Sequence, residues 1–86
     1  MTNHQAKYIV FMYGGAETPI IFPEHVGHSD FVLFLTSNPK ANVISAGFCE
    51  VYENDIKVWG KSFSLNKECR KKEDKELLEK MMIYQE

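Results

Sequence analysis

Residues 43–65 alternate bulky and small side chains with a period of two, which is the pattern of a β-hairpin. Asn54-Asp55 favours a two-residue turn with positive φ at both positions. Pairing outward from this turn sets Glu50 opposite Trp59. One face of the hairpin then carries Ile44, Phe48, Tyr52, Trp59, Phe63 and Leu65. The other face carries Ser45, Gly47, Cys49, Gly60, Ser62 and Ser64.

The second of these faces consists almost entirely of small side chains. A face of this kind lets another group come close to the strand backbone. A helix of the same chain, a second subunit and a ligand all fit this description. The pattern alone does not choose among the three.

Two further strands are predicted before the hairpin. Residues 7–13 are rich in β-branched and aromatic side chains and end at Gly14. Both faces of this segment are apolar, which predicts a central strand or one covered by a second subunit. Residues 18–22 predict a short edge strand, because Pro19 and Pro23 each remove a backbone donor.

The segment that follows His28 contains an apolar run at residues 31–35, which is too short for periodicity to decide between strand and helix. Ser29 or Asp30 is a suitable N-cap, and residues 38–39 form a suitable end. We therefore predict a short helix after His28.

From Asp74 the apolar period changes from two to about 3.6, which predicts a C-terminal amphipathic helix. Its apolar stripe consists of Leu77, Leu78, Met81 and Tyr84. Packing on the sheet is the favoured role of this stripe, and a partner groove is the alternative. The elements together predict one α+β domain over residues 1–86, with an antiparallel sheet of about four strands and two helices.

Composition agrees with a globular domain, since 44% of the 86 residues are hydrophobic and 26% are charged. A chain this small buries a limited core, so we expect self-association into a homo-oligomer. Residues 1–6 are polar and no apolar run reaches the length of a membrane span, which predicts a cytoplasmic protein without a membrane partner. In that compartment Cys49 and Cys69 are expected to be free thiols.

The net charge of −2 argues against a nucleic-acid polymer as the partner. The distribution of charge is uneven. Between residues 57 and 72 the cations are interrupted only by Glu68, and they are Lys57, Lys61, Lys67, Arg70, Lys71 and Lys72. This segment is either a local cationic strip or part of an ordinary mixed surface.

No catalytic or metal-binding motif stands out. His25-x-x-His28 is the only candidate for metal, but a structural zinc site normally has two closely spaced ligand pairs and the second pair is missing. Gly14-Gly15 lacks the Lys-Ser/Thr ending of a phosphate loop, and no serine or cysteine lies in a nucleophile signature. We therefore expect no enzyme, no metal and no cofactor.

Residues 60–65 are the best candidate for ligand binding. Their serines offer hydroxyl groups, and Lys61 with Arg70 would neutralise an anion. Trp59 and Phe63 would stack on a base or belong to the core, and the core is favoured. A phosphorylated small molecule suits this mixture. The predicted ligand-binding residues are His28, Ser45, Lys61, Ser62, Ser64 and Arg70.

Several short segments resemble a group of small accessory proteins of tailed phages and prophages. They are residues 7–11, 19–23, 28–29, 45–48 and 60–65 and the motif Asp74-x-x-Leu77-Leu78. Relatives carry Ser-Arg-Pro before the last helix, where this chain has Cys69-Arg70-Lys71.

This resemblance implies a counter-defence protein in the host bacterial cytoplasm. Small accessory proteins of this kind include oligomeric sponges that sequester nucleotide-derived immune signals. A protein-binding inhibitor of a host enzyme and a minor structural protein of the virion are the alternatives. This step from a resemblance to a function is an analogy and does not follow from the chemistry of a site.

Overall fold

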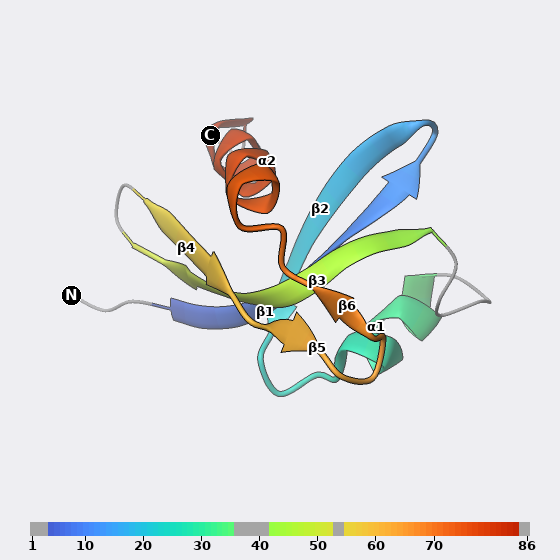
Figure 1. Cartoon of the computed structure of the whole chain (residues 1–86). Coiled ribbons are helices and arrows are strands. Elements are labelled where there is room, and N and C mark those ends of the chain that lie inside the picture. The colour runs from blue at the N-terminus through green and yellow to red at the C-terminus, as the bar shows by residue number, and fades with distance from the viewer. Residues whose placement is uncertain (1–3, 36–41, 53–54, 85–86) are drawn as a thin grey trace.

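The computed structural model describes residues 4–35, 42–52 and 55–84. Figure 1 shows the elements of this part of the chain. They are β1 (His4–Tyr13), β2 (Ala16–Pro23), α1 (His28–Leu35), β3 (Val43–Val51), β4 (Ile56–Trp59), β5 (Lys61–Ser62), β6 (Lys67–Glu68) and α2 (Lys71–Tyr84). The predicted α+β class, the four-stranded antiparallel sheet and the two helices are confirmed.

The main sheet has the strand order β2-β1-β3-β4, and every neighbouring pair is antiparallel. β1 therefore has a partner on both sides, which confirms the central strand predicted from its two apolar faces. β2 lies at one edge, as its two prolines predict. The predicted short strand over residues 18–22 is wrong in length, because β2 pairs with β1 from Ala16 to Pro23 and contains both prolines. Gly14 and Gly15 have φ values of 60° and 80° and join β1 to β2 in a tight turn.

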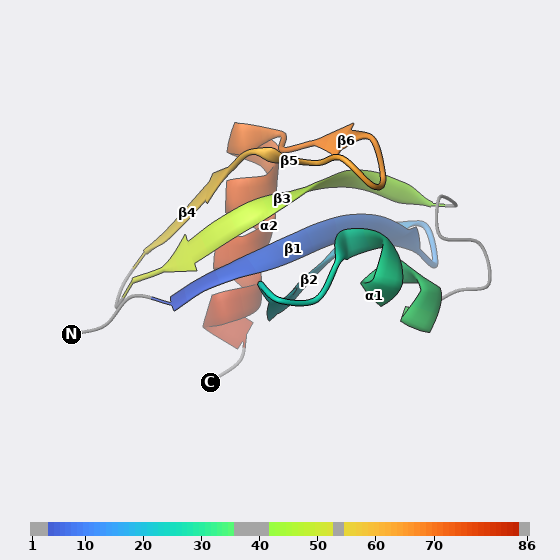
Figure 2. The ribbon, with the colours of Figure 1, turned by 90° about the horizontal axis from the view of Figure 1, so that it is seen from below.

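One helix covers each face of this sheet (Figures 1 and 2). The core under α2 is formed by the buried residues Tyr8, Val10, Cys49, Ile56, Val58 and Leu78. The core on the α1 side is formed by Ile9, Phe22, Val32, Val43, Ala46 and Leu65. The alternation along β1 thus supplies both cores, because successive side chains point to opposite faces.

Both helices begin earlier than predicted. The Phe31 amide donates to the Gly27 carbonyl at 3.0 Å, so α1 begins at His28 and the predicted caps Ser29 and Asp30 lie within its first turn. The predicted end at residues 38–39 lies outside the described residues. α2 begins three residues before Asp74.

The apolar stripe of α2 packs on the sheet, which confirms the role that the sequence favoured for it. Leu78 is fully buried, and Leu77 and Met81 are partly buried against the same core.

The predicted register of the β3–β4 hairpin is wrong by two residues. Trp59 pairs with Phe48, and Lys57 pairs with Glu50. The Tyr52 amide donates to the Asp55 carbonyl at 2.8 Å, so the chain reverses one residue earlier than a turn at Asn54-Asp55 requires. Asn54 itself lies outside the described residues. A shift of two preserves the side-chain faces, so Phe48 and Trp59 still share one face and Cys49 lies on the other. Ile44 was assigned to the bulky face, but it packs on the α2 side together with Cys49.

The structure seals most of the small-residue face inside the protein. Ser45 and Cys49 are fully buried under α2, and Gly47 is buried as well. Of the three occupants that the sequence left open, a helix of the same chain therefore covers the β3 part of this face, whereas Gly60 and Ser64 are exposed.

The predicted hairpin also breaks at Gly60, whose φ is 80°. Beyond it β5 and β6 form a separate two-stranded ribbon beside β3 (Figure 2). The Cys69 amide donates to the Gly60 carbonyl at 3.1 Å and closes the base of this ribbon.

Neither helix in the described part of the chain has the length and apolar composition needed to cross a bilayer. Cys49 and Cys69 carry free thiols.

Candidate functional site

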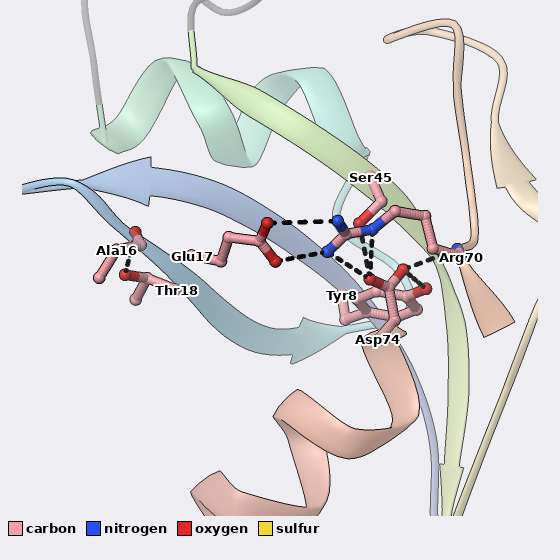
Figure 3. Close-up of polar contacts among 7 residues, drawn as sticks. All are labelled: Tyr8, Ala16, Glu17, Thr18, Ser45, Arg70 and Asp74. Carbon is pink, nitrogen blue, oxygen red and sulfur yellow. Dashed lines mark hydrogen bonds and ion pairs between the residues drawn. The ribbon is translucent and has the colours of Figure 1, made fainter. Parts of the chain in front are cut away.

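A buried carboxylate lies at the beginning of α2, where Asp74 is 0% exposed (Figure 3). Its Oδ2 accepts the Tyr8 hydroxyl at 2.6 Å and the Arg70 amide at 2.9 Å. Its Oδ1 accepts the Ser45 hydroxyl at 2.9 Å and Arg70 Nε at 3.0 Å. β1, β3 and α2 therefore meet at a single side chain.

Arg70 extends this network to the edge strand β2. Its guanidinium lies 2.9 Å from Glu17 Oε1, and the two side chains are 28% and 42% exposed. Hydrogen bonding to Glu17 raises the pKa of Arg70 against the opposing effect of burial, and Asp74 raises it further. Arg70 thus ties the first turn of α2 to β2.

The arrangement joins the beginning of α2 to the sheet and pairs the buried polar groups that take part in it. Burial raises the pKa of Tyr8, and its hydrogen bond to Asp74 raises that pKa further, so the phenol stays protonated and donates. Within residues 4–35, 42–52 and 55–84, every buried side-chain nitrogen and oxygen has a partner. We call the contacts of Asp74 with Tyr8, Ser45 and Arg70 the Asp74 network, and we interpret it as the contact that fixes the beginning of α2 on the sheet.

The six predicted ligand-binding residues do not form one site. Ser45 and Arg70 belong to the Asp74 network. The buried Ser62 hydroxyl lies 3.3 Å from the Ser64 hydroxyl and accepts the Leu65 amide, which places both serines in the β5–β6 turn.

Lys61 and His28 lie apart from the Asp74 network. Lys61 is exposed at the ribbon, with its Nζ 4.8 Å from the centre of the Phe63 ring. His28 packs on the α1 face between Phe22 and Phe48, so the sheet separates it from Arg70. A ligand-binding role for these residues stays a prediction.

His28 is buried, and its Nε2 donates to the Gly47 carbonyl at 2.9 Å. A carbonyl only accepts hydrogen bonds, so Nε2 carries the proton. Burial lowers the pKa of His28 below 6.5, the Gly47 bond opposes this, and the charge of Lys7 adds to it.

We expect this histidine to make the protein sensitive to acid. Below pH 6.5 His28 is protonated in the unfolded chain but stays neutral in the folded chain. The free energy of unfolding therefore decreases as the pH is lowered, until the pH falls below the pKa of His28 in the folded chain. We would measure the free energy of unfolding in urea between pH 7.5 and 4.5 and express it relative to the value of the same protein at pH 7.5. Between these pH values His28→Gln should lose less of its free energy of unfolding than the wild-type protein. His25→Gln, at an exposed position, is the control, and an equal change in both variants would contradict the assignment.

The histidine pair does not form a metal site. His25 is exposed and His28 is buried against aromatic rings. In the part of the chain that the structure describes, no three His, Cys, Asp or Glu side chains gather as metal ligands.

An open depression of about 430 Å³ lies at the outer strand β4 and the beginning of α2. Its lining consists of Glu50, Lys57, Val58, Trp59 and Lys71. Lys57 and Lys71 are exposed and Val58 is buried. This surface combines two ammonium groups, one carboxylate and an aromatic ring.

Trp59 is held in place by the sheet. Its ring stacks on Phe48 with centroids 6.2 Å apart and an angle of 23°. Glu50 is oriented by the Tyr52 hydroxyl, which donates to its Oε1 at 3.0 Å. Neither lysine makes an ion pair with another described residue.

The sequence pointed to Ser45, Arg70 and Trp59 but not to their partners in the Asp74 network or in the β4 depression. Lys57 and Lys71 were part of the cationic strip, but nothing in the strip showed that they share a depression with Trp59. Asp74 was interpreted only as a helix start. The core interpretation of Phe63 is wrong, because this side chain is 85% exposed. Comparison with protein-family models, curated proteins and solved structures finds no match for this chain.

Proposed function

We propose that this chain is a non-enzymatic counter-defence protein of a phage, which sequesters a nucleotide-derived immune signal as a homo-oligomer. The observation that carries the ligand part is the β4 depression, defined by Glu50, Lys57, Val58, Trp59 and Lys71. The phage and counter-defence parts rest on the segments that resemble tailed-phage accessory proteins.

The lining of the depression suits the parts of a nucleotide. An indole ring such as that of Trp59 stacks on a base. Lys57 and Lys71 supply two positive charges for phosphate oxygens, and Glu50 accepts from an amino or hydroxyl group. The volume of about 430 Å³ falls within the range of small-molecule sites, roughly 300–1,000 Å³.

The mechanism requires binding alone. No general base, nucleophile or metal group is needed to remove a signal from solution by holding it. Protection should therefore scale with the concentration of the protein and saturate at a fixed ratio of ligand to chain.

Isothermal titration calorimetry against mononucleotides, cyclic dinucleotides and ADP-ribose derivatives tests the proposal. We expect at least one compound to bind with a Kd below about 10 μM. Trp59→Ala should weaken this binding by about 30-fold, because a base–aromatic stack contributes about 1–3 kcal/mol. The double variant Lys57→Ala/Lys71→Ala should weaken it further and reduce its salt dependence.

Lys80→Ala is the matched control, since Lys80 is an exposed lysine on α2 that does not line the depression. Absence of heat for every compound at about 100 μM protein would exclude the sequestration mechanism. Equal weakening by the Lys80 variant would show that the ligand responds to overall charge and not to the depression.

A further inference from the structure

Three of the residues that line the β4 depression share one face of the sheet. Glu50 pairs directly with Lys57, and Phe48 pairs with Trp59. Residues two apart on a strand point to the same side, so Glu50 and Trp59 are diagonal neighbours on adjacent strands. Diagonal neighbours are separated by roughly 7–8 Å, which long and aromatic side chains bridge. A base stacked on the indole would therefore have the Glu50 carboxylate within reach of its edge.

The Glu50 carboxylate is oriented by the protein but keeps most of its capacity to accept hydrogen bonds. The Tyr52 hydroxyl donates to Oε1 at 3.0 Å. This bond raises the pKa of Tyr52, so the phenol stays protonated and remains the donor. A carboxylate has about four acceptor positions on its two oxygens, and Tyr52 occupies one of them. Glu50 is only half-buried, so a ligand can reach both oxygens.

The other lining residues do not distinguish one base from another. Every base offers a π face to an indole such as that of Trp59. Lys57 and Lys71 carry positive charges for phosphate groups, which all nucleotides share. Val58 contributes an apolar side chain. Selection among bases therefore depends on Glu50, the one lining side chain that accepts hydrogen bonds without donating any.

A group that only accepts hydrogen bonds selects a base edge with neighbouring donors. Guanine offers its N1–H and its N2 amino group side by side, so both can donate to one carboxylate. Adenine and cytosine offer one amino group beside an unprotonated ring nitrogen, whose lone pair would face the carboxylate. Uracil places its single N–H between two carbonyl oxygens. Guanine is therefore the base whose Watson–Crick edge matches a carboxylate.

We propose that the β4 depression selects guanine, with Trp59 stacking on the base and Glu50 accepting from its N1–H and N2 amino groups. Lys57 and Lys71 then serve the phosphate groups of the same ligand. This inference rests on the proposed function, because it names the base of the nucleotide that the protein sequesters. Glu50 is the residue that determines specificity.

Isothermal titration calorimetry with GDP, inosine diphosphate and ADP tests this selection, because the three compounds share the same ribose and diphosphate. We expect GDP to bind at least about 10-fold more tightly than ADP, which lies within the range that one bidentate base contact gives. Inosine diphosphate lacks the N2 amino group and keeps N1–H, so its affinity should lie between the two.

Glu50→Gln assigns the selection to this side chain. Glutamine keeps the shape and an acceptor for Tyr52, but it replaces one accepting oxygen by a donor. The preference for GDP over ADP should fall below about 3-fold, because one of the two guanine donors loses its acceptor. Glu76→Gln is the control, since Glu76 is an exposed acid on α2 outside the depression and its loss changes the net charge equally. This control should keep the preference of the wild-type protein.

The outcomes separate this inference from the proposed function. Equal affinities for GDP and ADP, or a preference that survives in Glu50→Gln, would overturn the selection of guanine and leave nucleotide sequestration standing. Failure of all three diphosphates to bind at about 100 μM protein would also overturn the selection. Sequestration itself fails only if the cyclic dinucleotides and ADP-ribose derivatives give no heat either.

Discussion

Replacing Asp74 by alanine should destabilise the protein by about 3–5 kcal/mol, because it breaks a buried charge pair and leaves several buried donors without an acceptor. Those donors are the Tyr8 hydroxyl, the Ser45 hydroxyl and the Arg70 amide, which now meet at the carboxylate. An 86-residue domain has a free energy of unfolding of roughly 4–13 kcal/mol, so the loss removes a large fraction of it. Urea unfolding followed by circular dichroism measures the difference.

Asp55→Ala is the control for this prediction. Asp55 also pairs with a cation on α2, since its Oδ1 lies 2.9 Å from Lys75 Nζ, but both side chains are exposed to solvent. Exposed ion pairs contribute little, because water and salt screen them. If Asp74→Ala costs no more than Asp55→Ala, the network does not anchor α2. Asp74→Asn, which keeps an acceptor, should fall between the two.

Replacing Gly47 by alanine should cost about 3 kcal/mol, the upper range for overpacking a core. A Cβ at this position would lie 2.6 Å from the Trp59 carbonyl oxygen and 3.2 Å from Cys69 Cβ. The first of these is backbone, so the end of β4 or the ribbon would have to move. We expect a lower urea midpoint and a changed fluorescence of Trp59.

Gly14→Ala separates crowding from loss of glycine's backbone freedom. Gly14 has a φ of 60° and would place its Cβ in open space, so only the strain of that conformation applies, roughly 1 kcal/mol. Equal losses at the two positions would mean that the close approach at Gly47 is unimportant. An unchanged Trp59 signal in Gly47→Ala would lead to the same conclusion.

Local patterns predicted most of the fold. The two apolar faces of residues 7–13 predicted a central strand, and β1 is paired on both sides. Pro19 and Pro23 predicted an edge strand, and the 3.6-residue period after Asp74 predicted a helix packed on the sheet. Each of these features depends on alternation or periodicity within one segment, which a sequence displays directly.

The register of the β3–β4 hairpin was harder to predict from the sequence. Pairing Trp59 with Glu50 or with Phe48 leaves the same side chains on the same faces, so alternation cannot distinguish the two registers. The pairing of β4 ends at Trp59, and Gly60 follows with a φ of 80°. A Cβ at Gly60 would lie 2.9 Å from the Phe48 ring, a contact with a residue twelve positions away that no local pattern displays.

The candidate site was the least predictable part. Trp59 and Lys71 are twelve positions apart and come together only because α2 begins beside the outer strand β4. Ser45 appeared available to a ligand in the sequence, but Asp74 accepts its hydroxyl from a position 29 residues away. Hydrogen bonds between distant residues leave no local pattern.

The sequence by itself determined which segments form strands and helices, which side chains share a face, and where the cations concentrate, because these are properties of neighbours along the chain. Tertiary structure alone decided what covers each face. It buried the small-residue side of β3 under α2, turned Phe63 outward and placed Trp59 beside two lysines. The physical reason is that burial and polar partnership depend on which elements pack together, and the packing of separate elements is set by the whole core.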